Sequence, residues 1–310
     1  MSLQPIAALL SALGALTAVY IVVWSNGAIA AVRQATATPS PAADARAPTR
    51  FQVGLGAVTN FFDALGIGSF APTTAVFKFK QMVPDRVIPG TLNVGHALPT
   101  IAQAFIYTSI IDVDTLTLYT MVAASALGAW LGAGTVARWP RRRIQIGIGV
   151  ALLVAAIVMF ITQLSLFPGG GDALGVRGTR LGIAVSGSFI LGSFQTLGIG
   201  LYAPCLILVS LLGMNPRAAF PIMTGSGAFT MAVASMRFIR ERSYSLRVAL
   251  GLAIGGVPGV LLAAYIVKEL PLYWLRWVVM VVVVYAAMTM LWAAATTKVP
   301  MTDVGAEANT

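Results

Sequence analysis

Charge is scarce in this sequence. Only 10% of its 310 residues are Asp, Glu, Lys or Arg, whereas 58% are hydrophobic. Such a composition excludes a soluble globular protein and indicates a polytopic membrane protein. The net charge of +10 comes from short basic clusters between apolar runs. These clusters favour a role in membrane orientation and argue against a nucleic-acid partner.

Cysteine and histidine are almost absent, since Cys205 and His96 are the sole examples of each. One cysteine excludes an intramolecular disulfide, and the pair cannot supply the ligand cluster of a zinc or iron–sulfur centre. The sequence also lacks HExxH, GxSxG and nucleotide-binding loop motifs. We therefore expect no metal, no cofactor and no enzyme activity.

Apolar runs divide the chain. The first run, at about 6–32, is too long for a signal-peptide core and predicts a retained transmembrane helix. Eight more runs are found at about 51–80, 87–110, 114–137, 144–167, 181–213, 218–240, 246–267 and 271–294. The expected organisation is an anchor at 1–32, a flexible linker at 33–50, a first transmembrane repeat at 51–167, an inter-repeat loop at 168–180, a second repeat at 181–295 and a cytoplasmic tail at 296–310.

One motif occurs twice in the apolar part of the chain. DALGIGSFAP at 63–72 returns as QTLGIGLYAP at 195–204, 132 residues later. Ten identities recur between 63–98 and 195–230 at this spacing: Leu65, Gly66, Ile67, Gly68, Ala71, Pro72, Met82, Pro84, Pro89 and Gly95. Glycines followed by proline break a helix, and at mid-membrane a break is tolerated only where it faces protein or a watery cavity. A repeated break therefore points to a solute site in a carrier.

The basic residues decide how the two repeats are oriented. If runs 51–80 and 181–213 each crossed once, the twenty basic residues would divide equally between the two faces. If each run is broken and crosses an even number of times, one face carries fifteen: Arg33, Arg46, Arg50, Lys78, Lys80, Arg86, Arg138, Arg141, Arg142, Arg143, Arg237, Arg240, Arg242, Arg247 and Lys298. The positive-inside rule favours the second arrangement, with inverted repeats, the N-terminus outside and the C-terminus cytoplasmic.

A helix that restarts after a break offers free N–H groups and a positive dipole end, which suit an anion. The restarts are expected near 69–73 and 201–205. The candidate substrate-binding residues are Asn60, Gly66, Gly68, Ser69, Thr73, Asn93, Gln195, Gly198, Gly200, Cys205, Thr224 and Ser226. The alternative is that glycine and proline only permit close helix packing.

Asp63 and His96 are the candidate proton-coupling residues. A carboxylate inside the membrane costs roughly 3 kcal/mol or more and is rarely kept without a role. Asp63 could couple transport to protons, form a structural hydrogen bond as the neutral acid, or bind a cation. His96 could relay protons or hydrogen-bond between helices. Their counterparts in the second repeat, Gln195 and Ala228, cannot ionise.

The paired motifs GIGSFAP and GIGLYAP, together with the turns PDRVIPGTLNVG and NPRAAFPIMTGSG that follow them, resemble those of the TauE/SafE sulfite exporter family. The resemblance covers about 51–295 and leaves out the first helix and the linker. It implies a secondary carrier in the cytoplasmic membrane for small sulfur-containing or organic anions such as sulfite, sulfonates and sulfoacetate.

The expected fold is therefore an all-α polytopic membrane protein: two inverted repeats of about four apolar helical segments, broken at the GIG motifs, plus one extra N-terminal transmembrane helix. The expected partners are a small anion, protons and the lipid bilayer. The chain could also form a homo-oligomer. A passive anion channel, a membrane scaffold and a membrane-embedded enzyme are the alternative functions.

Overall fold

The computed structural model describes residues 3–37, 47–66, 68–84, 87–135, 171–195 and 200–269, with isolated positions between 142 and 164 and between 277 and 296. In this part of the chain every named element is a helix, and an isolated bridge pairs Ala173 with Met214. The prediction of an all-helical protein is thereby confirmed. The runs expected at 144–167 and 271–294 lie almost wholly outside the described residues.

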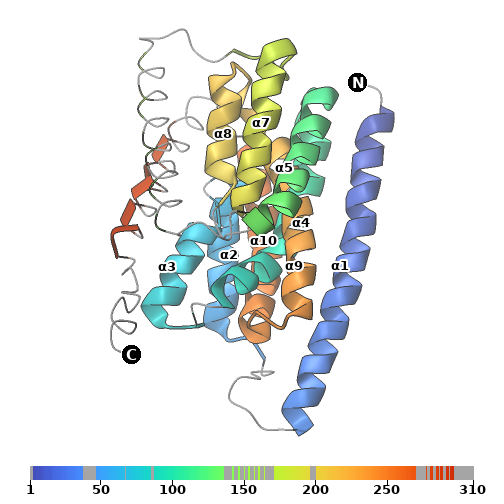
Figure 1. Cartoon of the computed structure of the whole chain (residues 1–310), viewed down its shortest axis with the longest axis vertical. Helices are drawn as coiled ribbons and strands as arrows, with labels where there is room; N and C mark the ends of the chain where they lie inside the picture. The colour runs from blue at the N-terminus through green and yellow to red at the C-terminus, as the bar shows by residue number, and fades with distance from the viewer. Residues whose placement is uncertain are drawn as a thin grey trace, which may run out of the picture.

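The helices run along a common long axis as a bundle (Figure 1). They are α1 (Leu3–Ala37), α2 (Arg50–Ala64), α3 (Phe70–Lys80), α4 (Ile88–Ile110), α5 (Thr115–Thr135), α7 (Gly178–Gln195), α8 (Tyr202–Leu211), the short 3-10 helix η3 (Pro216–Ala218), α9 (Ala219–Arg240) and α10 (Leu246–Glu269).

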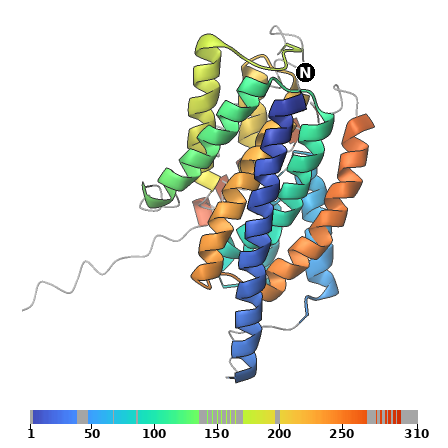
Figure 2. The same ribbon diagram turned by 90° about the vertical axis from the view of Figure 1, so that its right-hand side faces the viewer.

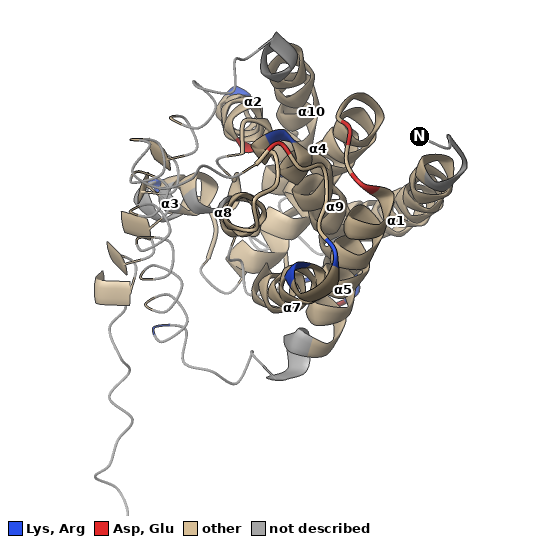
Figure 3. Cartoon of the chain, turned by 90° about the horizontal axis from the view of Figure 1, so that it is seen from above, with Lys and Arg blue, Asp and Glu red and all other residues tan. Residues whose placement is uncertain are grey.

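Three of the described segments are long and apolar enough to cross a membrane: Ile6–Arg33, Pro216–Arg240 and Leu246–Tyr265. Large apolar side chains point outward along the bundle, among them Val22, Trp130 and Leu262. Charged residues are sparse when the bundle is viewed down its length (Figure 3). Outward apolar side chains on helices of this length are what lipid contact requires, so the chain is a multi-pass membrane protein.

Helix α1 packs on the bundle. It lies against α4 and α9 (Figure 2), and the buried Tyr20 hydroxyl donates to the Val94 carbonyl at 2.9 Å. The helix runs on to Ala37, so the first residues of the predicted linker at 33–50 are helical. Residues 38–46 of that linker lie outside the described residues.

The segment that carries the first GIG motif is a hairpin of two short helices. Helices α2 and α3 have 15 and 11 residues, about 22 and 16 Å, and neither matches a hydrocarbon core of about 30 Å. The Lys80 ammonium lies 5.5 Å from the centre of the Phe51 ring. Both ends of this hairpin therefore meet at one end of the bundle.

The segment that carries the second GIG motif, α7 with α8, turns back in the same way. A Cβ placed on Gly213, just after α8, would lie 3.7 Å from Nη1 of Arg180 at the start of α7. The turn after α8 also bonds to the chain before α7, since the Asn215 amide donates to the Ala173 carbonyl at 2.8 Å. This hairpin lies toward the other end of the bundle from the α2–α3 hairpin (Figure 1).

Helix pairs in the bundle are reciprocal between the two halves. Helix α2 packs on α10 as α5 packs on α7, and α4 packs on α10 as α9 packs on α5. Glycines permit both outer pairs: Gly259 lies against the Ala57 carbonyl, and Gly128 lies against the Phe189 carbonyl. Helices α4 and α9 form the central pair.

The two central helices run in opposite directions. Gly90 at the start of α4 lies against Ser243, just beyond the end of α9. At the other end of the pair, the rings of Tyr107 and Phe220 are 5.3 Å apart, and Phe220 is in the first turn of α9. Helices α4 and α9, which follow the two copies of the repeated motif, therefore cross the bundle in opposite senses.

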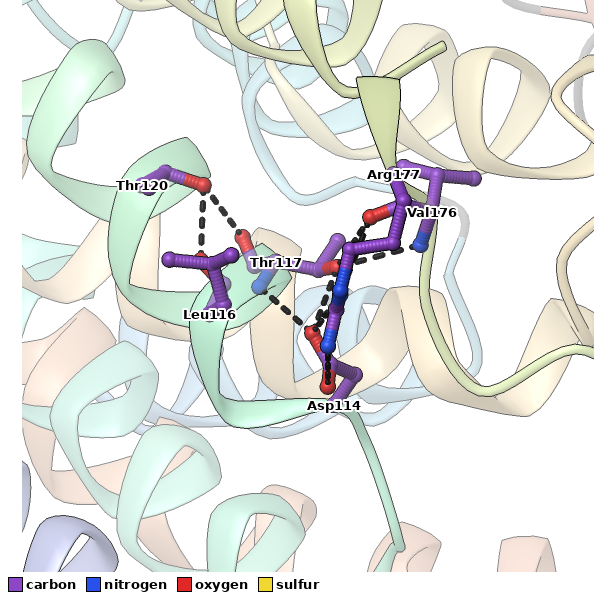
Figure 4. Close-up of polar contacts among 6 residues, drawn as sticks. All are labelled: Asp114, Leu116, Thr117, Thr120, Val176 and Arg177. Atoms are coloured by element: carbon purple, nitrogen blue, oxygen red, sulfur yellow. Dashed lines mark hydrogen bonds and ion pairs between the residues drawn. The ribbon is translucent and has the colours of Figure 1, made fainter.

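An ion pair fastens the chain before α7 to the start of α5 (Figure 4). The Arg177 guanidinium donates to both Asp114 oxygens, at 2.6 and 2.7 Å. The Thr117 amide donates to Asp114 Oδ1 at 2.9 Å, and the Thr117 hydroxyl accepts from the Val176 amide at 3.1 Å. Hydrogen bonds from Arg177 hold the pKa of Asp114 well below its usual range.

Replacing Asp114 with Asn should lower the melting temperature at neutral pH, because Asn keeps an acceptor for Thr117 but loses the charge that binds Arg177. A lowered pKa in the folded state stabilises at neutral pH, and that gain disappears as the pH falls through the acidic range. The difference between Asp114→Asn and wild type should therefore shrink on acidification. Asp112→Asn, in the same loop, is the control. A difference that does not change with pH would contradict this prediction.

The loop after α3 and the loop after α9 are predicted to face the cytoplasm. In a Cys205→Ala background, cysteines placed at Lys80 and Arg242 should react with a membrane-impermeant thiol reagent from the same side. A cysteine at Arg180 should react from the opposite side. Labelling of positions 80 and 242 from different sides would contradict the inverted arrangement.

Candidate functional site

Asp63 lies in the last turn of α2 and is 1% exposed. Its Oδ1 accepts the Ser69 backbone N–H at 2.5 Å, and its Oδ2 accepts Nε2 of Gln103 at 2.7 Å. Gly66 and Gly68 have φ of +92° and +82°, values that glycine adopts without strain. These two residues reverse the chain so that the start of α3 turns its N–H toward the carboxyl group.

Several buried polar atoms around Asp63 have incomplete hydrogen bonding among the described residues. They are Gln103 Oε1 and Gln195 Nε2, and the Ser69 hydroxyl has the Asp63 carboxyl group beside it as its one neighbour of this kind. The Thr100 and Tyr202 hydroxyls adjoin each other and bond to no other described group. An unsatisfied buried polar group costs about 1–3 kcal/mol. A group of such atoms in one region is the arrangement expected of a site that receives a polar ligand.

Contacts across the two halves bring these residues together. A Cβ on Gly66 would lie 3.4 Å from Leu206 of α8, and a Cβ on Gly227 of α9 would lie 3.1 Å from both Thr100 and Tyr202. Thr230, one turn further along α9, hydrogen-bonds to Oε1 of Gln195. We call the resulting set the polar cluster: Asp63, Ser69, Thr100, Gln103, Gln195 and Tyr202.

A second network surrounds His96. Its Nδ1 is 3.1 Å from Asn60 Oδ1, and its Nε2 is 3.2 Å from the Thr73 hydroxyl. Asn60 Nδ2 donates to the Gly56 carbonyl at 2.8 Å, so Asn60 Oδ1 is the acceptor and His96 donates from Nδ1. Both ring nitrogens are then used, and the network ties α2, α3 and α4 together. This geometry favours a structural hydrogen bond for His96 over a proton relay.

Four predicted substrate-binding residues are not among the six members of the polar cluster. Asn93 donates to the Pro89 carbonyl at 2.8 Å, and Thr224 donates to the Phe220 carbonyl at 2.6 Å. The Ser226 carbonyl accepts from Thr230 at 2.9 Å, and Cys205 belongs to the buried apolar core. No hydrogen bond among the described residues joins these four to Asp63.

The structure describes one of the two glycines of the second break. Gly200 is described and has open space where a Cβ would stand. Gly198, predicted as a substrate-binding residue, lies outside the described residues.

Sequence reasoning missed three residues of the polar cluster: Thr100, Gln103 and Tyr202. A signal was present, because His96, Thr100, Gln103 and Tyr107 follow one another at helical spacing within an apolar run. In the structure all four are buried, and the Tyr107 hydroxyl donates to the Ala64 carbonyl at 3.0 Å. Tyr202 lies within the repeated motif itself, but its first-repeat counterpart is Phe70, which gave no polar signal.

Comparison with protein families assigns the chain to one of them. The sulfite exporter TauE/SafE family matches residues 2–159 and 181–308. The chain belongs to this family. Because the TauE/SafE match begins at residue 2, it includes α1, so the prediction that the first helix and linker lie outside the resemblance was wrong. Membership makes the protein a membrane transporter. Comparisons with curated proteins and with solved structures gave no match.

Side chains at the two helix breaks should stop transport. Gly68→Leu and Gly200→Leu would each fill open space beside a break, and at Gly68 the positive φ adds strain of about 1–2 kcal/mol. Both variants should reach the membrane but reduce solute flux in proteoliposomes to background.

Gly182→Leu is the matched control for these two substitutions. Gly182 is an exposed glycine of α7 that also has open space beside it, so its variant should transport normally. Normal flux by both break variants would contradict a role for these glycines in the transport path.

Proposed function

We propose that the protein is a proton-coupled secondary carrier of small sulfur-containing or organic anions, of the sulfite, sulfonate and sulfoacetate type. The observation that carries this proposal is that residues flanking both helix breaks meet in the polar cluster. The members of the cluster come from α2, α4, α7 and α8 and from the turn before α3, and α9 contacts them through Gly227 and Thr230. Family membership supports the substrate class, since the matched family is that of sulfite exporters.

The chemistry of the cluster suits an anion. Ser69, Thr100 and Tyr202 carry hydroxyl donors, and Gln195 has an amide nitrogen without a partner among the described residues. Helices α3 and α8 both begin beside the cluster, at Phe70 and Tyr202, and helix starts bear partial positive charge. Together these groups could replace the water that a sulfonate or sulfite oxygen loses on entering the membrane.

The arrangement of the bundle supports inverted repeats and alternating access. The starts of α3 and α8 are 132 residues apart, the same spacing as the repeated motif. The antiparallel course of α4 and α9 and the reciprocal outer pairs are what a twofold axis in the membrane plane would produce. With the basic residues cytoplasmic, the N-terminus of this inner-membrane protein would be outside and the C-terminus inside.

Asp63 supplies the coupling in this proposal. The protonated acid tolerates an anion nearby, whereas the carboxylate would repel it strongly in surroundings of low dielectric constant. Gln195, at the corresponding place in the second repeat, is polar but keeps one charge state. A single titrating group would thus load the anion with a proton and release both together.

The test is uptake into proteoliposomes that contain the purified full-length protein. Asp63→Asn should keep exchange of labelled sulfite or methanesulfonate between the two sides, because the site still holds a neutral side chain. The same variant should lose accumulation driven by a pH gradient. Asp112→Asn, an exposed acid outside the bundle, is the control and should accumulate solute as wild type does.

Two results would count against the proposal. Gradient-driven accumulation by Asp63→Asn would show that another group takes the coupling proton. Wild-type flux that does not saturate and ignores the pH gradient would instead indicate a passive channel.

A further inference from the structure

Gln103 is bonded at only one end of its side-chain amide. Its Nε2 donates to Asp63 at 2.7 Å, while its Oε1 has no partner among the described residues. The side chain is fully buried on α4. A buried carbonyl oxygen without a donor is costly. In its present orientation the amide donates to Asp63, which suits the ionised acid and does not suit the protonated acid.

The contacts of Asp63 suit its ionised form. Both oxygens accept from N–H groups, one from Ser69 and one from Gln103, and the Ser69 hydroxyl also adjoins the carboxyl group. An ionised carboxylate only accepts. A protonated Asp63 has an O–H that needs an acceptor. The backbone N–H of Ser69 stays on Oδ1, so the proton belongs on Oδ2, which faces Gln103.

The unbonded Oε1 of Gln103 can accept this O–H, and the Ser69 hydroxyl is the other oxygen beside the carboxyl group. Rotation about the last side-chain bond of glutamine exchanges its oxygen and nitrogen, and that bond has a broad, roughly twofold preference. After the exchange, Oε1 would accept from Asp63 and the NH₂ group would point away from it. Thr100 lies one turn earlier on the same face of α4, with Tyr202 adjoining it.

We propose that protonation of Asp63 turns the Gln103 amide, so that its NH₂ group becomes a donor to the transported anion. This inference rests on the proposed function, in which Asp63 takes up the coupling proton. Deprotonation reverses the amide and withdraws that donor while restoring the negative charge. Proton and anion are thereby coupled through one side chain that is never itself ionised.

Among the described titratable groups in this region, Asp63 is the one expected to titrate between acidic and neutral pH. Tyr107 of α4 and Tyr202 of α8 are the described titratable side chains near enough to interact with it, and tyrosine ordinarily stays protonated up to about pH 10. On α10, the residues that contact α2 are uncharged, among them Leu252, Gly255 and Gly256. His96 is held by Asn60 and Thr73.

The second half of the chain lacks this device. Gln195 stands where the first half has Asp63, and Ser235 stands where the first half has Gln103. Gln195 bonds instead to Thr230 of α9. The proposed amide switch is therefore present once per chain.

The test is the affinity of the purified full-length protein for sulfite and methanesulfonate, measured by calorimetry from acidic to neutral pH. Methanesulfonate keeps a single charge throughout, so its pH dependence reports the protein. Gln103→Met is close to glutamine in shape but has no amide. It should lower the affinity at acidic pH about 10- to 100-fold, the effect of losing one hydrogen bond to a charged group, and should flatten the pH dependence.

Asp63→Asn examines the switch without changing Gln103. The NH₂ group of the introduced asparagine would donate to Gln103 Oε1 at every pH, so this variant should bind at neutral pH as tightly as wild type binds at acidic pH. The gain should vanish in the double variant Asp63→Asn/Gln103→Met. Ser188→Ala, which removes a buried hydroxyl of α7 outside the polar cluster, should bind as wild type does.

A Gln103→Met variant that keeps the wild-type pH dependence would overturn the switch, as would weak binding by Asp63→Asn at every pH. Either result would leave the carrier proposal intact. Failure of the wild-type protein to bind either anion at any pH would overturn the proposed function itself.

Discussion

The hydrogen bond between a buried carboxyl group and a backbone amide holds the centre of this protein together. The bond from Ser69 to Asp63 closes the loop in which α2 stops and α3 begins, and the bond from Gln103 fixes that loop to α4. A carboxyl group in the membrane is expensive to bury. Hydrogen-bond donors at the helix break offset this cost. The broken helix and the buried acid therefore each depend on the other.

The two halves share reciprocal helix pairs and differ in polar chemistry. In the first half, Asn60, Thr73 and His96 tie α3 to its neighbours. At the corresponding places of the second half stand Gly192, Cys205 and Ala228, which offer no comparable network. The hairpin α2–α3 is therefore secured by hydrogen bonds, whereas α8 rests mainly on apolar contacts such as those of Leu206.

Much of this architecture could be predicted from the sequence, because glycine, proline and charge act locally. The motif spacing located both helix restarts, and the basic residues predicted which loops share a face. Side-chain partners depend on contacts between distant segments and could not be predicted in the same way. Asn93 is one turn from His96, yet it bonds to its own helix. Gln103 was overlooked because its role depends on a hydrogen bond to Asp63, forty residues earlier in the chain.

The glycine contacts between outer helices have a consequence for how the bundle can move. Gly255 and Gly259 of α10 lie against the backbone of α2, while Gly128 of α5 and Gly192 of α7 lie against each other's helices. Each of these close pairs joins one helix from either half of the chain. Helices held by such backbone contact would move together, and each such group would then contain helices that carry both copies of the repeated sequence.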